Sequence, residues 1–244
     1  MRIARLLTET GPIRGTYRDG VVHADDGDYE VGVDGPLLPP CEPSALYCVG
    51  RNFTDTLEQK GYERPEAPDF FIKPPTAVIA HERPVVYPAF TDELTYAGEL
   101  AAVIDRRCRN VSVDEVSDVV RGYTILNDLD ALDQHGVTER KAFDGSGPLG
   151  PWIETDVDPF DLDMWTDIAG ERRQESNTSQ MLFDPDELVS YLSHRFTFRP
   201  GDVVSFGSPG NPGVVEPGDT IEMHYEGIGT LRNTVVTSRD QRSA

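Results

Sequence analysis

Cysteine and long apolar runs are scarce in this chain of 244 residues. Its three cysteines, Cys41, Cys48 and Cys108, form no C-x-x-C pair, which argues against a disulfide framework or a structural zinc site. No apolar run approaches the roughly 18 residues that a membrane-spanning helix needs. Residues 1–7 are too short and too soon polar for a signal peptide. These absences predict a reduced, cytoplasmic protein that does not bind a membrane.

Lysine is the scarcest charged residue. Only Lys60, Lys73 and Lys141 occur, arginine supplies the other 19 positive charges, and 43 acidic residues bring the net charge to −21. Such a charge repels itself in dilute buffer, whereas molar salt, with a Debye length of about 3 Å, screens it. Acid excess with few lysines therefore predicts a cytosolic protein of a salt-in halophile, with an acidic mesophilic protein as the alternative. Nucleic-acid binding is disfavoured, because the sequence offers no basic cluster.

Turn signals divide the chain into a small first part and a larger second part. Short apolar pieces alternate with turns over residues 1–43, which predicts antiparallel hairpins followed by a proline-rich linker. β-rich segments dominate residues 44–238, and residues 239–244 form a polar tail. The segments expected to form strands in the larger part are 46–49, 69–72, 99–104, 123–127, 151–154, 202–206, 220–225 and 229–236.

Helix signals are few. Ser112 with Glu115 three residues later is the pattern of a capping box, which predicts a short helix to about Val120. Asp184 and Pro185 supply a helix N-cap and a proline at the first helical position. The sequence thus predicts a mixed α+β, β-rich fold with few short helices.

Two acidic residues occupy unusual places in apolar strands. Glu99 interrupts the small, apolar segment 97–104, and Asp128 ends the apolar run 123–126. Burying an unpaired charge is costly, so each carboxylate must point to solvent or into a polar site. Taken alone, each is more often a strand-end acid than a ligand.

About ten short motifs follow one another over some 190 residues. They are Cys48-Val49-Gly50-Arg51-Asn52-Phe53, Phe71-Ile72-Lys73-Pro74-Pro75, Gly98-Glu99-Leu100, Gly122-Tyr123-Thr124, Asn127-Asp128, Lys141-Ala142-Phe143-Asp144 with Pro148-Leu149-Gly150-Pro151, Asn177-Thr178-Ser179, Arg199-Pro200-Gly201-Asp202-Val203, Gly207-Ser208-Pro209 and Gly227-Ile228-Gly229-Thr230-Leu231-Arg232-Asn233. In this order they resemble the fumarylacetoacetate hydrolase family. The resemblance implies a β-roll of that family's type over residues 44–238, a small β-hairpin domain and linker at 1–43, and a homodimer.

The resemblance also implies a Mg²⁺ or Mn²⁺ site with Glu99 and Asp128 as ligands. The family's strand normally reads Tyr-Glu-Gly-Glu-Leu, whereas this chain has Ala97 in place of the first glutamate. Residues 97 and 99 share one strand face, so three carboxylates would otherwise meet. Mg²⁺ commonly takes one or two carboxylates plus water and substrate oxygens, so Ala97 is expected to weaken the site.

A second departure lies in the family's lid helix, where acylpyruvase-like members carry Asn-Tyr-x-x-His-x-x-Glu. Here Thr56 stands for the histidine and Gln59 for the glutamate, with Glu58 available after a one-residue shift. Acid–base groups contribute about 10²–10⁴-fold to a rate, and threonine and glutamine do not titrate near neutrality. Leu132 replaces an arginine, and His135 follows it.

The remaining candidates are implied by their match to family motifs. Lys141 with His135 and Glu58 are the catalytic candidates, and the substrate-binding candidates are Arg51, Asn52, Lys73, Thr178 and Ser208. If lysine is excluded from the general surface, Lys73 and Lys141 are expected to do something that arginine cannot, since lysine is a compact point charge.

Two functions therefore stay open for a protein that takes a small carboxylate. The first is an enzyme that acts on a 2-oxo or 2-hydroxy acid by metal-assisted enolate chemistry, as C–C hydrolysis, decarboxylation or isomerisation. The second is a catalytically degenerate family member that acts as a ligand-binding or interaction protein. Decarboxylation and tautomerisation demand less of a water-activating base, so they survive the loss of the His–Glu pair better.

Overall fold

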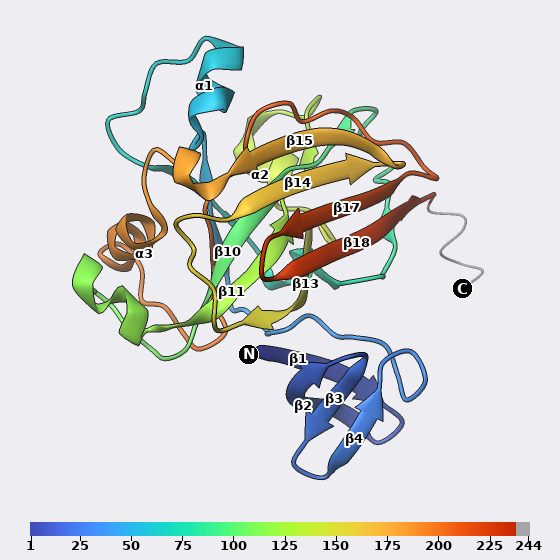
Figure 1. Cartoon of the computed structure of the whole chain (residues 1–244). Coiled ribbons are helices and arrows are strands. Elements are labelled where there is room, and N and C mark those ends of the chain that lie inside the picture. The colour runs from blue at the N-terminus through green and yellow to red at the C-terminus, as the bar shows by residue number, and fades with distance from the viewer. Residues whose placement is uncertain (238–244) are drawn as a thin grey trace.

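Strands dominate the structure, as the sequence predicts (Figure 1). The computed structural model describes residues 1–237, so the polar tail expected at 239–244 lies outside the described residues. The strands are β1 (Arg2–Thr8), β2 (Gly11–Arg18), β3 (Val21–Ala24), β4 (Gly27–Glu30), β5 (Leu46–Gly50), β6 (Asp69–Lys73), β7 (Val78–Ala80), β8 (Val85–Val86), β9 (Leu94–Thr95), β10 (Gly98–Ile104), β11 (Val120–Asn127), β12 (Asp130–Ala131), β13 (Gly147–Glu154), β14 (Asp163–Ile168), β15 (Glu171–Asn177), β16 (Val203–Ser205), β17 (Thr220–Tyr225) and β18 (Gly229–Val236). The helices are α1 (Thr54–Lys60), α2 (Gly136–Lys141) and α3 (Pro185–Ser193), with 3₁₀ helices η1 (Pro75–Ala77), η2 (Val113–Asp118) and η3 (Thr178–Gln180).

The largest sheet carries β10 and β11 near the middle of its body portion. Its strands lie in the order β4-β3-β2-β1-β13-β11-β10-β16-β5-β6, and β7 pairs with β13. Strands β10 and β11 are antiparallel, with Gly98 opposite Asn127. All of β10 is buried, which explains why its side chains are small or apolar apart from Glu99. The end of this strand pair therefore brings Glu99 and Asp128 to one region.

A second sheet packs across β10 and β11, with strand order β15-β14-β17-β18-β8 (Figure 1). Apolar side chains such as Leu100, Ile125 and Met223 fill the core between the two sheets. The sheets come closest at Gly98, where a Cβ atom would lie 2.6 Å from Thr166 Oγ1. A glycine is therefore required there, and since side chains alternate, Glu99 faces away from the second sheet.

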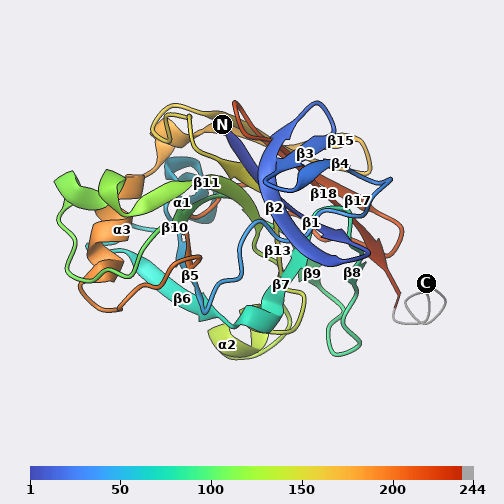
Figure 2. The same cartoon turned by 90° about the horizontal axis from the view of Figure 1, so that it is seen from below.

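The first four strands form the hairpins that the sequence predicts, and they extend the large sheet. Ile3 of β1 pairs with Ile153 of β13. A small core around Leu6 and Val22 holds the hairpins together, and Tyr17 stacks on Trp152 of the body with ring centroids 4.4 Å apart. Figure 1 shows these hairpins at one end of the molecule and α1 at the opposite end of the body, and in Figure 2, seen from below, the hairpins lie in front of the body.

Both helix signals are confirmed. The capping box of Ser112 and Glu115 opens η2, and Asp184 caps α3 by accepting a hydrogen bond from the backbone of Glu187. The hairpin of β14 and β15 was not predicted, because the polar residues of β15 conceal a strand. Within residues 1–237, no helix is long and apolar enough to cross a membrane.

Candidate active site

A cavity of about 500 Å³ opens beside the ends of β10 and β11, between α1 and α2. Glu99, Asp128 and Lys141 form its charged floor. Apolar side chains, among them Phe71 and Leu132, form part of the walls. The roof consists of α1 and the loop 207–213, whose contacts are given below.

Two of the chain's three lysines meet at Asp128. The Nζ of Lys73 lies 2.8 Å from Asp128 Oδ1, while Lys141 pairs with the other carboxylate oxygen and lies 3.2 Å from Asp130 Oδ2. Burial alone would raise the pKa of Asp128, but the two ammonium groups lower it below its ordinary value. Asp128 is therefore a buried carboxylate that stays ionised.

Lys73 is fully buried beneath the floor and does not line the cavity. Its ammonium donates hydrogen bonds to the backbone carbonyls of Leu129 at 3.1 Å, Ser146 at 3.0 Å and Lys141 at 2.5 Å. A compact ammonium can reach three carbonyls and a carboxylate at once, whereas a planar guanidinium cannot. This geometry gives a physical reason for a lysine at position 73.

Glu99 is the second buried carboxylate of the floor, and it is poorly compensated. The hydroxyl of Ser205 donates a hydrogen bond to Glu99 Oε2 at 2.6 Å. Burial, and then the negative charge of Asp128, raise the pKa of Glu99 to about 8. The charges of Lys141 and Lys73 lower this pKa, but by less than burial and Asp128 raise it.

These floor residues fit a divalent cation with an incomplete set of protein ligands. Among residues 1–237, no group of three or more histidine, cysteine, aspartate or glutamate side chains is placed to hold a metal ion. Ala97 lines the cavity in place of a third carboxylate, and its carbonyl accepts a hydrogen bond from the Asp128 backbone at 2.9 Å. Glu99 and Asp128 offer hard carboxylate oxygens, the kind of ligand that Mg²⁺ takes in proteins.

The roof is held by neutral hydrogen bonds at the two altered lid positions. Thr56 Oγ1 donates to the carbonyl of Ser208 at 3.1 Å, and the backbone N–H of Asn211 donates to Gln59 Oε1 at 2.7 Å. Both side chains thus tie α1 to the loop 207–213. Neither can move a proton at neutral pH.

Gln174 of β15 holds the same loop from below and was missed by sequence reasoning. Its Oε1 accepts a hydrogen bond from the backbone N–H of Gly98 at 3.3 Å, and its Nε2 donates to the carbonyls of Pro209 at 2.9 Å and Gly210 at 3.3 Å. One buried amide therefore links the strand that carries Glu99 to the loop that carries Ser208. No local signal marked it, because β15 itself was not predicted.

Five of the predicted site residues line the cavity, namely Arg51, Glu99, Asp128, Lys141 and Ser208. The structure adds Arg140, which lies beside Lys141 on α2 and binds Asp130 with both Nε at 2.8 Å and Nη2 at 2.5 Å. The sequence gave no reason to single out this arginine.

Asn52 and Thr178 are buried behind the cavity wall and do not line it. The Asn52 amide nitrogen donates to the carbonyls of Phe206 at 2.8 Å and Phe183 at 3.0 Å. Thr178 Oγ1 accepts a hydrogen bond from the backbone of Leu162 at 2.8 Å. Both side chains hold loops in place, since their polar atoms are used by the backbone.

Glu58 and His135 are exposed and lie outside the cavity lining. His135 is the residue before α2, and its side chain makes no capping hydrogen bond. Glu58 lies on α1 between residues that face inward. Neither side chain replaces the missing histidine and glutamate at the cavity.

The sequence model described as fumarylacetoacetate (FAA) hydrolase C-terminal matches residues 45–236. The chain belongs to the fumarylacetoacetate hydrolase family. A solved structure from Mycobacterium smegmatis, described as a 5-carboxymethyl-2-hydroxymuconate delta-isomerase, is 38% identical with a TM-score of 0.89, over 98% of this chain and 99% of that chain. The mitochondrial oxaloacetate tautomerase of Bos taurus is 34% identical over 77% of this chain and 89% of its own length.

A third relative carries a metal. Maleylpyruvate hydrolase from Sphingobium sp. SYK-6, solved in complex with manganese(II) and pyruvate, is 25% identical with a TM-score of 0.84, over 97% of this chain and 99% of that chain. Relatives of this chain thus include isomerases, a tautomerase and a hydrolase of small acids, and one of them binds a divalent metal.

Proposed function

We propose that this chain is an enzyme of small 2-oxo or 2-hydroxy acids that works through an enolate, by isomerisation or decarboxylation rather than by C–C hydrolysis. The observation that carries the proposal is the contrast inside one cavity. Its floor holds the ionisable side chains of Glu99, Asp128 and Lys141, and its roof holds Thr56 and Gln59, which do not titrate near neutrality. The tautomerase and isomerase among the relatives support the same class of reaction.

Lys141 is the group that we expect to hold the anionic oxygen of the substrate. Burial alone would lower the pKa of Lys141, but Asp128 and Asp130 raise it well above its ordinary value. The ammonium therefore keeps its proton and stabilises negative charge that develops on an enolate oxygen. The hydroxyl of Ser208 offers a further donor on the cavity wall.

Glu99 and Asp128 are the proposed ligands of Mg²⁺ or Mn²⁺, with substrate and water oxygens completing the coordination. When bound, a divalent cation polarises a 2-oxo group and stabilises an enolate as a Lewis acid. The manganese and pyruvate in the related maleylpyruvate hydrolase support this choice. Ala97 is expected to weaken the affinity rather than to abolish it.

Hydrolysis is disfavoured because nothing at the roof is suited to activate water. Thr56 and Gln59 already hydrogen-bond the loop 207–213, and the exposed Glu58 and His135 do not line the cavity. Decarboxylation needs no attacking water, and tautomerisation needs a proton donor and acceptor but no activated water, so both demand less of the missing pair than hydrolysis does.

Oxaloacetate tests the proposal, because ketonisation of its enol is followed by ultraviolet absorbance and its decarboxylation by release of CO₂. With Mg²⁺ the unaltered protein is expected to accelerate one of the two reactions, and Lys141→Met to reduce that rate by about 10²-fold or more. Glu139→Gln, an exposed change on the same helix, should leave it unchanged.

The opposite result would favour the degenerate alternative. If oxalate, an enolate mimic, binds in calorimetry while neither reaction is accelerated, the chain is a ligand-binding protein. The homodimer implied by the resemblance stays a prediction, and sedimentation in about 2–3 M KCl, where charge repulsion is screened, tests it. The halophilic source and the cytoplasmic location also stay predictions.

A further inference from the structure

Three arginines converge at the junction between the N-terminal hairpins and the body. Arg5 of β1, Arg14 of β2 and Arg121 of β11 line a cleft of about 290 Å³, and Glu42 is the one acidic residue in its lining. The sequence concealed this group, because its members lie far apart along the chain. None of the three lines the candidate active site.

The strand register places the first two arginines against each other. Arg5 is directly opposite Arg14 in the antiparallel pairing of β1 and β2. Like charges directly opposite each other on neighbouring strands are destabilising. The pairing therefore has a free-energy cost, which the ion pair of Arg5 with Glu42 offsets only on the side of Arg5.

Arg121 reaches the same cleft from a β-bulge. The pairing of β10 with β11 shifts so that Gly122 faces Val103 and Val120 faces Ile104, which leaves Arg121 as the extra residue. Bulges of this kind change the direction of a side chain and often lie next to functional sites. Three strands thus bring three guanidinium groups to one cleft.

The local acids do not balance these charges. Arg5 pairs with Glu42 at 2.5 Å, and Arg121 pairs with Asp105. Within residues 1–237, Arg14 has no hydrogen bond or ion pair from its guanidinium. Loss of hydration, followed by the charges of Arg121 and Arg5, lowers the pKa of Arg14. Burial raises the pKa of the Cys41 thiol to about 12, so it stays neutral.

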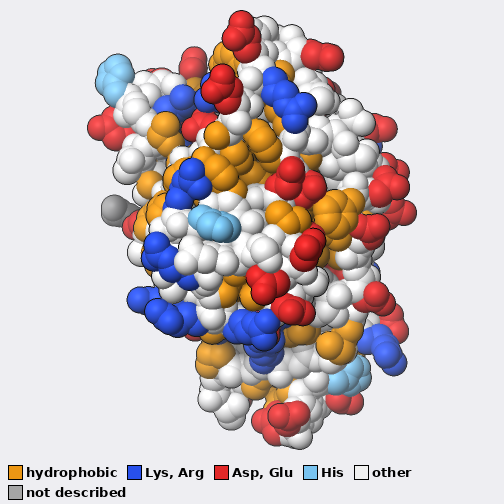
Figure 3. Space-filling view, turned by 90° about the vertical axis from the view of Figure 1, so that its left-hand side faces the viewer, with side chains coloured by type: hydrophobic (Ala, Val, Ile, Leu, Met, Phe, Trp, Pro, Cys, Tyr) orange, Lys and Arg blue, Asp and Glu red, His pale blue; other side chains and the backbone are white. Residues whose placement is uncertain are grey.

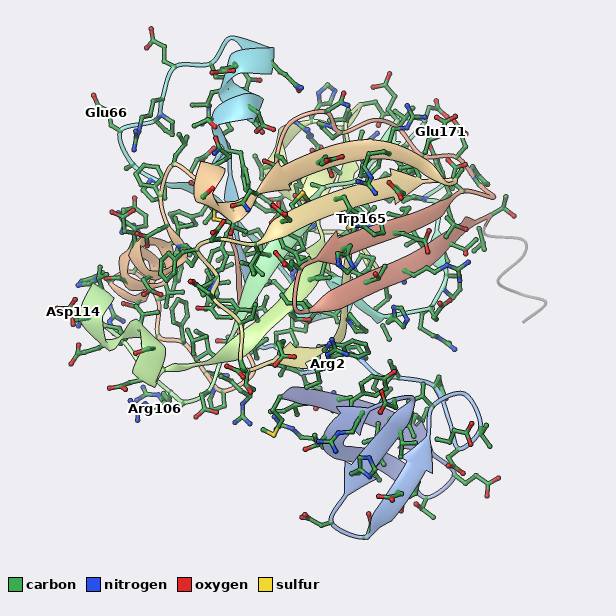
Figure 4. The ribbon with its side chains drawn as sticks, viewed as in Figure 1. Arg2, Glu66, Arg106, Asp114, Trp165 and Glu171 are labelled. Carbon is green, nitrogen blue, oxygen red and sulfur yellow. The ribbon has the colours of Figure 1, made fainter. Side chains whose placement is uncertain are left out.

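A second cavity outside the active site also holds arginines. Arg106 and Arg107 follow Asp105 and line this separate cavity of about 520 Å³ together with Glu115 and Asp118, and neither arginine forms an ion pair with a described residue. Figure 4 labels Arg106 at the lower edge of the body and Arg2 at its junction with the hairpins. On the face shown in Figure 3, arginines and lysines gather at the left and in the lower middle. Acidic side chains dominate the right-hand edge.

We propose that the cleft lined by Arg5, Arg14 and Arg121 binds an oxyanion with two or more negative charges, of the phosphate or pyrophosphate type. A planar guanidinium binds such oxygens in bidentate fashion. The cleft is of a size for a small anion, and one bound dianion would relieve the repulsion between Arg5 and Arg14. In a chain with a net charge of −21, a local surplus of positive charge against the overall sign is the feature to explain.

The site would be separate from the catalytic cavity, although both lie on β11. Arg121 is near one end of this strand, and Asp128 follows its other end. Seven residues of extended chain span about 23 Å. Because Arg5 and Arg14 come from the hairpins and Arg121 from the body, the bound anion would join the two parts.

Titration calorimetry with pyrophosphate tests the proposal, at constant ionic strength with chloride as the balancing anion. The unaltered protein is expected to bind one pyrophosphate, and Arg14→Ala to weaken binding by about tenfold or more, since a charge-assisted contact is lost. Arg18→Ala is the matched control, because it removes an exposed arginine from the same strand outside the cleft. It should change the affinity by no more than about twofold.

Arg14→Ala removes an exposed side chain and a like-charge contact, so we expect it to fold, and circular dichroism checks this. Tighter binding of pyrophosphate than of adenosine monophosphate would support a free inorganic anion, and the reverse order would support the phosphate group of an organic ligand. The proposal is overturned if no anion binds more tightly than chloride. It is equally overturned if Arg14→Ala and Arg18→Ala lose the same affinity, since that would reflect net charge alone.

Discussion

The floor of the active-site cavity carries ionisable side chains, whereas its roof is held by neutral ones. On the floor, Lys73 and Lys141 pair with buried Asp128, while buried Glu99 accepts a hydrogen bond from Ser205 and has a raised pKa. In the roof, Thr56 and Gln59 hold the loop 207–213 through neutral hydrogen bonds. Under the proposed function, the floor would stabilise an enolate, whereas Thr56 and Gln59 in the roof cannot move a proton at neutral pH.

Removing the floor's buried cation should have the largest effect. Lys73→Met leaves Asp128 with one partner fewer and takes a donor from three backbone carbonyls, of which those of Ser146 and Lys141 keep another donor. Breaking a buried ion pair from one side costs about 3–5 kcal/mol of unfolding free energy. Urea denaturation measures the loss, and a loss below about 1 kcal/mol would show that the floor is more hydrated than described.

Glu99 should make the metal-free protein less stable as pH rises. Its pKa is about 8 in the folded protein against an ordinary 4.5, so the folded state keeps a proton that the unfolded state releases. The unfolding free energy therefore falls between these two values and levels off above about pH 8. Glutamine at position 99 does not titrate. In EDTA at pH 8, the unfolding free energy of Glu99→Gln should therefore exceed that of the unaltered protein by on the order of 2–4 kcal/mol.

Denaturation curves at several pH values check this prediction, with exposed Glu139→Gln as the control. Equal pH slopes for Glu99→Gln and the unaltered protein would contradict a raised pKa of Glu99. Saturating Mg²⁺ should reduce the difference between the two proteins, because a bound cation favours the ionised carboxylate.

Ala97→Glu should repair the metal affinity of the floor and leave the roof unchanged. The new carboxylate would face the cavity beside Glu99, and the affinity for Mg²⁺ should rise by at least the roughly 10–100-fold associated with supporting groups of metal sites. Calorimetry with Mg²⁺ in high salt measures it. An unchanged dissociation constant would mean that Glu99 and Asp128 do not share one ion.

Gln174→Met should weaken the connection between strand β10 and the loop 207–213. Methionine fills a similar volume but removes the side-chain partner of the Gly98 N–H and of the Gly210 carbonyl, while the Pro209 carbonyl keeps the hydrogen bond from Ser208 Oγ. We expect a loss of about 1–3 kcal/mol in stability and a KM that rises more than kcat falls. Glu175→Gln, an exposed change next to it, is the control. If Gln174→Met and Glu175→Gln have the same stability, KM and kcat, Gln174 does not position the loop 207–213.

The floor residues could be predicted from the sequence because the features that mark them are local. Glu99 and Asp128 are charged residues that break apolar strands, and Ala97 shares a strand face with Glu99 by simple alternation. The depletion of lysine from the rest of the chain marked Lys73 and Lys141, which do meet at one carboxylate. Such features need no knowledge of distant parts of the chain.

The roof and the arginine cleft could not be predicted in the same way. The bond between Gln59 and Asn211 joins residues 152 positions apart, and Gln174 reaches the loop from a strand whose polar sequence conceals it. Asn52 and Thr178 match family motifs, yet their polar atoms serve neighbouring backbone groups. A motif marks that a residue is used, and only tertiary contacts show for what.

The cleavage of an acylpyruvate by four chains tests the contrast between floor and roof most directly. They are the unaltered protein, Ala97→Glu, the double variant Thr56→His with Gln59→Glu, and the triple variant. With Mg²⁺, we expect cleavage to stay slow in the first two and to be fastest in the triple variant, with a gain of about 10²-fold or more over Ala97→Glu. Rapid cleavage by the unaltered protein would contradict the account, because another group would then already activate water.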